Sequence, residues 1–554
     1  MAELILKMRT VSSLEKCFWD QPIEEIPEKR RFYMFQNERL SFQVVYRTEH
    51  PIDRIERHCP ITLSGALAPY ATVRAVGNIL NMYPANNVPY EGELLRTEPG
   101  AYPDLLRPLP YGHAVSLPNG QTLALWVDIE LPEGFSAGCY DFSLSISSRS
   151  AVLGRVDCEI TVAGASLPKQ KLIHTEWFYT DCIANYYHEK PFSESHWRHI
   201  EAFMKTAVRN GINMILTPVF TPELDTRVNG ERLTTQLVDI TLDEDGTYRF
   251  GFDKLGRFID LALKLGVAYF EIPHFFTQWG AKAAPKIVVK VKGRRKKLFG
   301  WHTPSTSPEY ADFLSQFLPS LVGYFKSRGV DRRCYYHVSD EPSASALEHY
   351  AACKNLIAPY LTGYPIIDAM SNLEFYQKGV LEKPVPNTRS AMQFIEAGVE
   401  DLWVYHCGSG YKGVSDRSLA MPTRRTRAIG VQWYRYRIAG FLHWGYNFYN
   451  TWLSIAPLDP YQSPEGAYFN PTGDAFLVYP GTDGTAWESI RLNALREAVD
   501  DMRALTLYEE RFGREAAEAL LMEDAGGELT FLRYPTRDDY YIGLREKIVK
   551  AFLS

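Results

Sequence analysis

Residues 334–342 read Cys-Tyr-Tyr-His-Val-Ser-Asp-Glu-Pro, so an apolar run leads directly into two adjacent acids. The run has the length and composition of a short buried strand, and Pro342 suits the start of a following helix. Asp340 and Glu341 therefore stand where a strand ends. Because two neighbouring carboxyl groups repel each other, one is pushed towards its protonated form while the other stays ionised. Such a pair can supply a general acid and an electrostatic partner in one place, although an Asp-Glu dipeptide can equally be a solvated turn.

Further apolar segments of the same kind occur on both sides of this strand, and segments with helical apolar spacing, such as 195–209 and 255–265, separate them. Strands that alternate with helices favour an α/β fold with a parallel sheet, and eight of them suggest a closed (β/α)8 barrel of the TIM type. The expected strands are Leu172–Trp177, Asn213–Thr217, Ala268–Pro273, Cys334–Ser339, Tyr364–Ala369, Val380–Val385, Asp401–His406 and Gly440–Asn447.

The part of the chain before the barrel has strand patterns without helices, for example 41–47, 122–129 and 138–146. This alternation predicts an antiparallel β-sandwich over residues 1–167. Proline and small polar residues at 165–169 then mark a boundary, so the barrel is expected over residues 168–455.

Residues 456–554 are expected to form a small C-terminal α/β extension that packs on the barrel. The segment contains one strand, 475–479, and one helix whose apolar residues recur every three or four positions between Leu492 and Leu505. The acids of this helix are expected on its solvated face, without a functional role. They are Glu497, Asp500 and Asp501.

Composition restricts the partners. Sixty Lys and Arg against sixty-six Asp and Glu leave a net charge of −6, which favours neither nucleic acid nor an anionic membrane surface. The first ten residues show no signal-peptide pattern, and no run of about 18 uncharged apolar residues could span a membrane. Eight scattered cysteines without CxxC pairs predict reduced core thiols. We therefore expect a cytoplasmic enzyme.

In a (β/α)8 barrel, functional side chains gather at the ends of several strands. Several expected strand ends carry aromatic, acidic or imidazole side chains, which suit a sugar substrate. Each of them alone is more often structural, but their convergence on one face predicts a ligand site. The candidates for substrate binding are Glu176, Trp177, His274, Asp368, Asn372, His406, Trp444 and Asn447.

A basic stretch follows the third strand, Lys286 to Lys297. Its layout predicts a β-hairpin with a charged, solvated tip rather than a contact to phosphate or nucleic acid. The return strand would bring Trp301 and His302 to the barrel mouth as further substrate-binding candidates. Neither HxH nor HExxH spacing occurs, and there is no GxGxxG, Walker-type or GxSxG motif, so we expect no metal and no cofactor.

Five segments resemble glycoside hydrolase family 123 and the wider bacterial set that shares its C-terminal domain of unassigned function (DUF4091 type). The similarity covers nearly the whole chain. It is carried by HVSDEP (337–342), FGWHT (299–303), GFLHWGYN (440–447), FLVYPG (476–481) and SIRLNALREAVDDM (489–502). The resemblance implies an exo-acting N-acetyl-β-galactosaminidase that retains the anomeric configuration through substrate-assisted catalysis.

The family's adjacent catalytic acids fall on Asp340 and Glu341. In a substrate-assisted reaction the 2-acetamido oxygen of the sugar attacks, so no separate protein nucleophile is needed and both acids can lie on one side. By this hypothesis Glu341 is the general acid and then the general base, while Asp340 orients the acetamido group.

Two other readings stay open. One is a glycosidase without the acetamido requirement, with Glu341 as acid and a remote carboxylate as nucleophile: Glu176, Asp368 or Glu271. The other is a glycan-binding protein without turnover. In each reading the partner is a glycan, and the sequence leaves the oligomeric state undetermined.

Overall fold

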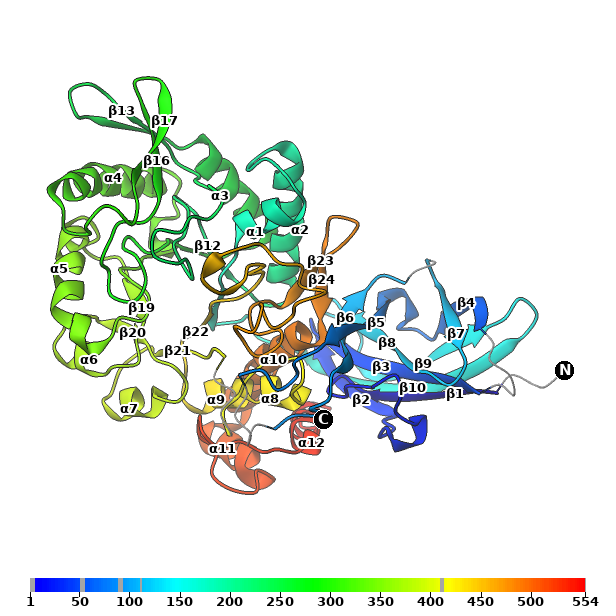
Figure 1. The fold of residues 1–554 in the computed structure, drawn as a ribbon. Coiled ribbons are helices and arrows are strands. Elements are labelled where there is room, and N and C mark those ends of the chain that lie inside the picture. The colour runs from blue at the N-terminus through cyan, green and yellow to red at the C-terminus, as the bar shows by residue number, and fades with distance from the viewer. Residues whose placement is uncertain (1–4, 50–54, 88–92, 110–111, 409–412, 554) are drawn as a thin grey trace. The chain divides into compact units, whose positions relative to one another are not determined.

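The computed structural model describes residues 5–49, 55–87, 93–109, 112–408 and 413–553 (Figure 1). The chain divides into two compact units. Unit 1 comprises Met1–Gln170, Gly410–Arg435 and Trp487–Ser554, and unit 2 comprises Lys171–Ser409 and Tyr436–Ala486. This division cuts across the three consecutive segments expected from the sequence, because the chain after residue 456 contributes to both units instead of forming one extension.

Two β-sheets with a shared apolar core form the N-terminal part of unit 1. Phe42 and Val127 from the first sheet and Phe142 and Ile160 from the second are at most 1% exposed in this core. The first sheet is antiparallel, with the order β1 (Ile5–Ser12), β3 (Arg39–Glu49), β8 (Thr122–Glu130), β5 (Ala71–Asn81), β6 (Gly100–Arg107) and β24 (Ala486–Ser489).

The second sheet of unit 1 differs from a purely antiparallel sandwich sheet, since its edge strand β2 runs parallel to β10. Its other neighbouring strands are antiparallel. The order is β2 (Arg31–Gln36), β10 (Val152–Ser166), β9 (Gly138–Ser147), β4 (Ile55–Ser64) and β7 (Ala114–Pro118).

A second apolar core joins the helices of unit 1 to its N-terminal strands. Phe35 and Leu167 pack there with Leu505, Leu544 and Ile548. Because this core recruits residues from the end of the chain, the C-terminal helices belong to unit 1. They are α8 (Thr423–Arg427), α9 (Ile429–Arg435), α10 (Ile490–Phe512), α11 (Arg514–Glu523) and α12 (Asp538–Lys550).

The expectation that the acids of α10 lie on a solvated face is wrong. Glu497, Asp500 and Asp501 are 8%, 6% and 4% exposed. The apolar spacing of this helix identified one packed face correctly, but α8 and α12 also contact α10 within unit 1. The side that carries the acids is therefore covered as well.

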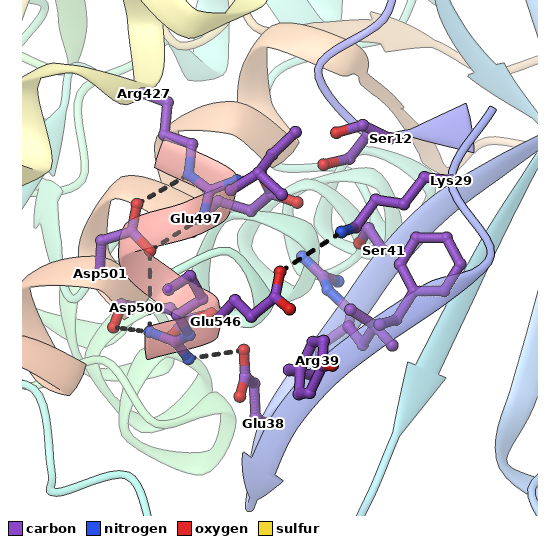
Figure 2. Close-up of a pocket in the computed structure, with 16 residues that line it drawn as sticks. Ser12, Lys29, Glu38, Arg39, Ser41, Arg427, Glu497, Asp500, Asp501 and Glu546 are labelled. Carbon is purple, nitrogen blue, oxygen red and sulfur yellow. Dashed lines mark hydrogen bonds and ion pairs between the residues drawn. The ribbon is translucent and has the colours of Figure 1, made fainter. Parts of the chain in front are cut away.

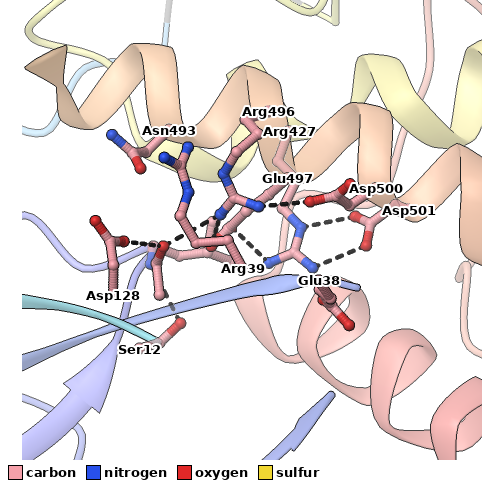
Figure 3. Close-up of polar contacts among 12 residues, drawn as sticks. Ser12, Glu38, Arg39, Asp128, Arg427, Asn493, Arg496, Glu497, Asp500 and Asp501 are labelled. Atoms are coloured by element: carbon pink, nitrogen blue, oxygen red, sulfur yellow. Dashed lines mark hydrogen bonds and ion pairs between the residues drawn. The ribbon is translucent and has the colours of Figure 1, made fainter. Parts of the chain in front are cut away.

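Arginine side chains compensate these buried acids (Figures 2 and 3). Arg427 donates to both carboxylate oxygens of Asp501 at 2.7 and 3.0 Å and to Glu497 at 2.9 Å. Arg545 pairs with Glu38 at 2.6 Å. The three acids of α10, the two arginines and Glu38 line one cavity of about 70 Å³. Since an unpaired buried charge is strongly destabilising, each of these residues depends on its partners. The charges of the cluster are structural.

Unit 2 is built on parallel strands, and each of the eight strands expected from the sequence contains an observed one. Six form one parallel sheet in the order β18 (Cys334–Tyr335), β15 (Tyr269–Glu271), β12 (Met214–Leu216), β11 (Ile173–Glu176), β22 (Gly440–His443) and β21 (Trp403–Tyr405). The other two, β19 (Ile367–Ala369) and β20 (Lys383–Val385), pair with each other in parallel.

Single parallel bridges connect the edges of these two sheets. Tyr336 follows β18 and bridges to Ile366 beside β19, and Asn387 follows β20 and bridges to Tyr405 of β21. The helices of unit 2 lie between its strands in the sequence. They are α1 (Thr180–Tyr186), α2 (Glu194–Arg209), α3 (Asp253–Leu265), α4 (Pro308–Ser327), α5 (Leu347–Ile357), α6 (Glu374–Gln377) and α7 (Ala391–Glu396).

The predicted hairpin is confirmed. β16 (Ile287–Val291) and β17 (Arg294–Phe299) are antiparallel, and Lys292 and Gly293 form the turn with positive φ angles, as a tight hairpin requires. The hairpin belongs to a four-stranded sheet with β13 (Asp239–Leu242) and β14 (Tyr248–Gly251), and the short strand β23 (Val478–Pro480) completes the strands of unit 2. No helix among the described residues is long and apolar enough to cross a membrane.

Candidate active site

Asp340 and Glu341 follow β18, at the carboxyl end of the parallel strands. Glu341 has a φ of 40°, a left-handed conformation that is uncommon for a residue with a side chain and that concentrates at functional sites. Asp340 is half-buried and Glu341 is exposed. The backbone N–H of Trp279 donates to the carbonyl of Asp340 at 2.8 Å, and the Tyr405 hydroxyl donates to Oε1 of Glu341. The two acids are thus adjacent in sequence but held by different neighbours.

The surroundings of Asp340 raise the pKa of its carboxyl group. Burial raises the pKa of this carboxyl well above its ordinary value, the charges of Glu341, Asp368 and Asp225 add to the increase, and His337 opposes it. The expected repulsion between the paired acids therefore contributes, but burial contributes more.

His337 lies on the same segment and is held between two carboxylates. Its Nδ1 is 2.9 Å from Asp368 Oδ1, its Nε2 is 2.7 Å from Glu271 Oε1, and all three side chains are fully buried. Burial alone would lower the pKa of His337, but these hydrogen bonds raise it to about 9. The ring is therefore an imidazolium at neutral pH, and the cation compensates two buried anions.

Asp368 was a candidate for substrate binding, but protein groups occupy its carboxylate. Besides His337, the Tyr350 hydroxyl donates to it at 2.5 Å, and the backbone N–H groups of Val338 and Ser339 donate at 3.0 and 3.3 Å. The carboxylate thus fixes the backbone that leads into Asp340. Asp368 therefore holds the segment that carries Asp340 and Glu341.

The other two remote acids are also committed to internal contacts. Glu271 accepts from the Thr175 hydroxyl and, at 2.8 Å, from the Trp177 indole N–H. Glu176 lies 3.2 Å from a ring nitrogen of His174. Both acids are fully buried, and Trp177 is 3% exposed, so this indole supports Glu271 rather than facing solvent.

His274 packs against His337 with the ring centroids 4.3 Å apart. Burial and the charge of His337 hold the pKa of His274 well below its ordinary value, so this ring is neutral. One nitrogen each of His274 and His337 and one oxygen of Asp368 lie within 4.8 Å of one another, a spacing that metal ligands also show. Both nitrogens of His337 already lie at hydrogen-bond distance from carboxylates, Nδ1 from Asp368 and Nε2 from Glu271. The trio fits a charge-compensating network better than a metal centre.

Two candidate amides have structural roles. The side chain of Asn447 is fully buried, accepts from the backbone N–H of Tyr179 at 2.8 Å and donates to the carbonyl of the same residue at 3.0 Å. Asn372 accepts from the backbone N–H of Glu374 at 3.0 Å, at the start of α6. Asn447 thus uses both its amide oxygen and its amide nitrogen in these contacts, and Asn372 uses its amide oxygen.

The aromatic candidates on the late strands and the hairpin lie in different environments. Trp444 is half-buried and donates to Asp474 at 3.1 Å, while His406 is buried with its ring 5.2 Å from that of His443. Trp301 is half-buried, and the exposed His302 contacts the carbonyl of Leu298 at 3.2 Å within its own hairpin.

Sequence reasoning missed Asp225, a half-buried carboxyl in the loop after β12. Burial raises its pKa to about 7, and its charge raises the pKa of Asp340. It also has a left-handed backbone, with a φ of 45°, and accepts from the N–H of Leu453 at 3.1 Å. The loop around Asp225 has no regular apolar spacing, so the sequence contained no signal that placed this acid at the site.

Acidic side chains at the carboxyl ends of parallel strands, in a mixed α/β fold, are an arrangement that glycoside hydrolases use. The chain belongs to glycoside hydrolase family 123: the model of the family's catalytic domain ("Glycoside hydrolase 123, catalytic domain") matches residues 177–508, more than half of the 554 residues.

A solved structure of a family 123 enzyme agrees with this family at the level of the fold. A family 123 glycoside hydrolase from Clostridium perfringens, studied for glycolipid glycan hydrolysis, is 14% identical with a TM-score of 0.72, over 99% of this chain and 98% of that one. A xyloglucanase of family 5 from Bacteroides ovatus is 9% identical with a TM-score of 0.32, over 85% of this chain and 98% of that one. No curated protein matches the chain.

The buried imidazolium predicts a stability effect. We expect His337→Phe to lower the free energy of unfolding by about 3–5 kcal/mol, because Glu271 and Asp368 lose the charge between them. His196→Phe, which removes a buried histidine that contacts only neutral groups, is the control and should cost less.

The effect should depend on pH in a defined direction. Since the folded-state pKa of His337 is raised to about 9, its contribution is complete below about pH 6.5, the ordinary histidine value, and is lost as the pH rises through about 9. Urea unfolding of the wild type and the variant across pH 6–10 measures this. A stability difference that grew with pH would contradict the assigned charge.

Proposed function

We propose that this protein is a retaining exo-glycosidase that removes terminal β-linked N-acetylhexosamine, with N-acetylgalactosamine as the first candidate, through an oxazolinium intermediate. One observation carries the proposal: the three remote acids that the sequence offered as nucleophiles are fully buried and hydrogen-bonded inside the protein. They are Glu176, Glu271 and Asp368. The acids at the strand ends are adjacent, which suits a substrate that brings its own nucleophile.

In the first step Glu341 donates a proton to the glycosidic oxygen while the acetamido oxygen attacks the anomeric carbon. The bond to the leaving group breaks, the leaving alcohol departs, and the sugar becomes a cationic oxazolinium. In the second step the Glu341 carboxylate takes a proton from water, which attacks the anomeric carbon and reopens the ring. Two inversions at one carbon retain its configuration.

Asp340 is assigned to the acetamido group. As a carboxylate it accepts the acetamido N–H and stabilises the positive charge that develops on the ring. Burial and the neighbouring acids raise the pKa of Asp340 in the free protein. In the complex, the acetamido N–H that faces Asp340 favours the ionised form of Asp340.

We also propose that the eight strands of unit 2 form one closed (β/α)8 barrel. The single bridges between the edges of the two sheets support this. With them, every strand has a parallel neighbour on both sides, and the strands follow one another around the ring in the order of the sequence. In such a barrel the loops after the strands would surround Asp340 and Glu341.

Aryl glycosides test the substrate. We expect cleavage of aryl β-N-acetylgalactosaminide or aryl β-N-acetylglucosaminide, and little cleavage of aryl β-galactoside. Activity on the unacetylated sugar alone would overturn the oxazolinium mechanism. It would favour the second candidate function, a conventional retaining glycosidase with Asp225 as nucleophile. The half-buried carboxyl of Asp225, whose charge acts on Asp340, supports this alternative. A 2-fluoro sugar would then label Asp225, which peptide mass spectrometry detects.

A further inference from the structure

Two large indoles are exposed on the loops around the catalytic pair. Trp279, in the loop after β15, is 48% exposed, and Trp452, in the segment after β22, is 53% exposed. Indole side chains bury a large apolar area when they find a partner, so their exposure beside a site marks a surface for binding. Neither residue has a role in the proposed chemistry.

Trp279 is attached directly to the catalytic pair. Its backbone N–H donates to the carbonyl of Asp340, and its own φ of 60° is an outlier for a bulky residue. The preceding side chain, Gln278, donates to the carbonyl of Thr226 at 2.8 Å. The loop that carries Trp279 is therefore fixed to Asp340 on one side and to the loop of Asp225 on the other.

Trp452 is attached to the same loop of Asp225. The next two residues bind Asp225: the N–H of Leu453 donates to its carboxylate at 3.1 Å, and the hydroxyl of Ser454 donates to its carbonyl at 2.7 Å. The carbonyl of Leu453 accepts from the N–H of Arg227 at 3.0 Å. Hydrogen bonds thus connect the three loops that follow β12, β15 and β22. Trp279 lies on the loop after β15, and Trp452 lies on the loop after β22.

The ring of Trp452 continues a row of aromatic side chains. It stacks on Phe469 with the centroids 5.9 Å apart and an interplanar angle of 19°, and Phe469 lies 6.0 Å from Trp444. Trp444 is the half-buried strand-end indole considered above as a binding candidate for the terminal sugar. The row therefore leads from this half-buried candidate residue to an exposed indole.

We propose that Trp279 and Trp452 form a subsite for the sugar ring on the leaving-group side of the scissile bond. This inference rests on the proposed function, because an exo-glycosidase holds the terminal sugar at its catalytic acids and leaves the next sugar outside. The apolar face of an uncharged hexose packs on an indole while its hydroxyl groups stay in water. The ligand class is a β-linked oligosaccharide of at least two rings.

Two substrates with the same terminal sugar separate this subsite from the catalytic centre. One is the disaccharide of N-acetylgalactosamine β-linked to galactose, and the other is β-N-acetylgalactosaminyl fluoride, whose leaving group has no ring. We expect Trp279→Ala and Trp452→Ala each to lower kcat/KM for the disaccharide about tenfold more than for the fluoride, the size of one aromatic contact. Trp452→Phe should recover most of the loss. The control is Trp19→Ala, an exposed indole of unit 1 that should leave both substrates unchanged.

The outcomes distinguish this inference from the proposed function. If the wild type cleaves only unacetylated sugars, the proposed function fails, and the comparison is made with the galactosyl fluoride and a galactosyl disaccharide. If it cleaves neither, calorimetric titration of the disaccharide into wild type and Trp452→Ala decides. The subsite would be overturned if the alanine variants lost kcat/KM equally on both substrates or lost none. It would also be overturned if wild type and Trp452→Ala bound the disaccharide equally well. Unchanged kinetics with loss of a dimer on gel filtration would assign the indoles to contacts between copies and also overturn it.

Discussion

We expect Glu341→Gln to lower kcat/KM for a disaccharide substrate by about 10²–10⁴-fold, the usual contribution of a general acid and base. An amide cannot protonate the leaving oxygen. The loss should therefore shrink for an aryl glycoside whose phenol leaves easily, because this group needs little protonation. Steady-state kinetics across a series of leaving groups measures the effect, which should appear as a steeper dependence on leaving-group acidity.

The second step gives an independent readout for the same variant. With a good leaving group the missing general base makes attack by water slow. Azide needs no base, so it should restore turnover and yield the β-glycosyl azide, which nuclear magnetic resonance identifies. Glu348→Gln, at an exposed glutamate in the first turn of α5, is the matched control and should behave as wild type. Equal losses for good and poor leaving groups, without azide rescue, would contradict the assignment of Glu341.

The strands of unit 2 could be predicted because they are short, apolar and bounded by breakers. Each expected strand contains an observed one, but the observed ones are shorter: the run from Cys334 to Ser339 pairs as β18 only over two residues. Tyr336 adds a single bridge to Ile366, and beyond it the N–H groups of Val338 and Ser339 donate to the carboxylate of Asp368 instead of to a strand. A hydrogen bond from a distant strand decided where this strand ends, and a local pattern cannot contain that information.

The same limit applies to the candidate site. Position at a strand end identified Glu176, Asp368 and Asn447 as candidate binding residues. It could not distinguish a side chain that faces the substrate from one that is hydrogen-bonded to protein groups. Asp368 and its partner His337 are 31 residues apart, and Asn447 and Tyr179 are 268 apart. Conversely, Trp279 and Trp452 lie in irregular loops, where exposure depends on how the loops connect. The acids of α10 were misplaced for a related reason, since helical spacing describes one packed face and α10 is covered on more than one.

Asp340→Asn is expected to lower kcat/KM for an N-acetylhexosaminide by about 10²–10³-fold, the loss typical of a group that stabilises charge in the transition state. Asparagine keeps the size of the side chain but not the negative charge that opposes the growing oxazolinium. The pH profile gives the second readout. Since burial and neighbouring acids raise the pKa of Asp340, wild-type activity should fall as the pH decreases through that raised value, and the variant should lack this acid limb. Asp225→Asn is the comparison: by lowering the pKa of Asp340 it should shift the acid limb to lower pH without removing it. Unchanged turnover of an acetamido sugar by Asp340→Asn would show that Asp340 does not orient the acetamido group. A larger loss of activity in Asp225→Asn than in Asp340→Asn would show that the essential carboxylate is Asp225, in the loop after β12.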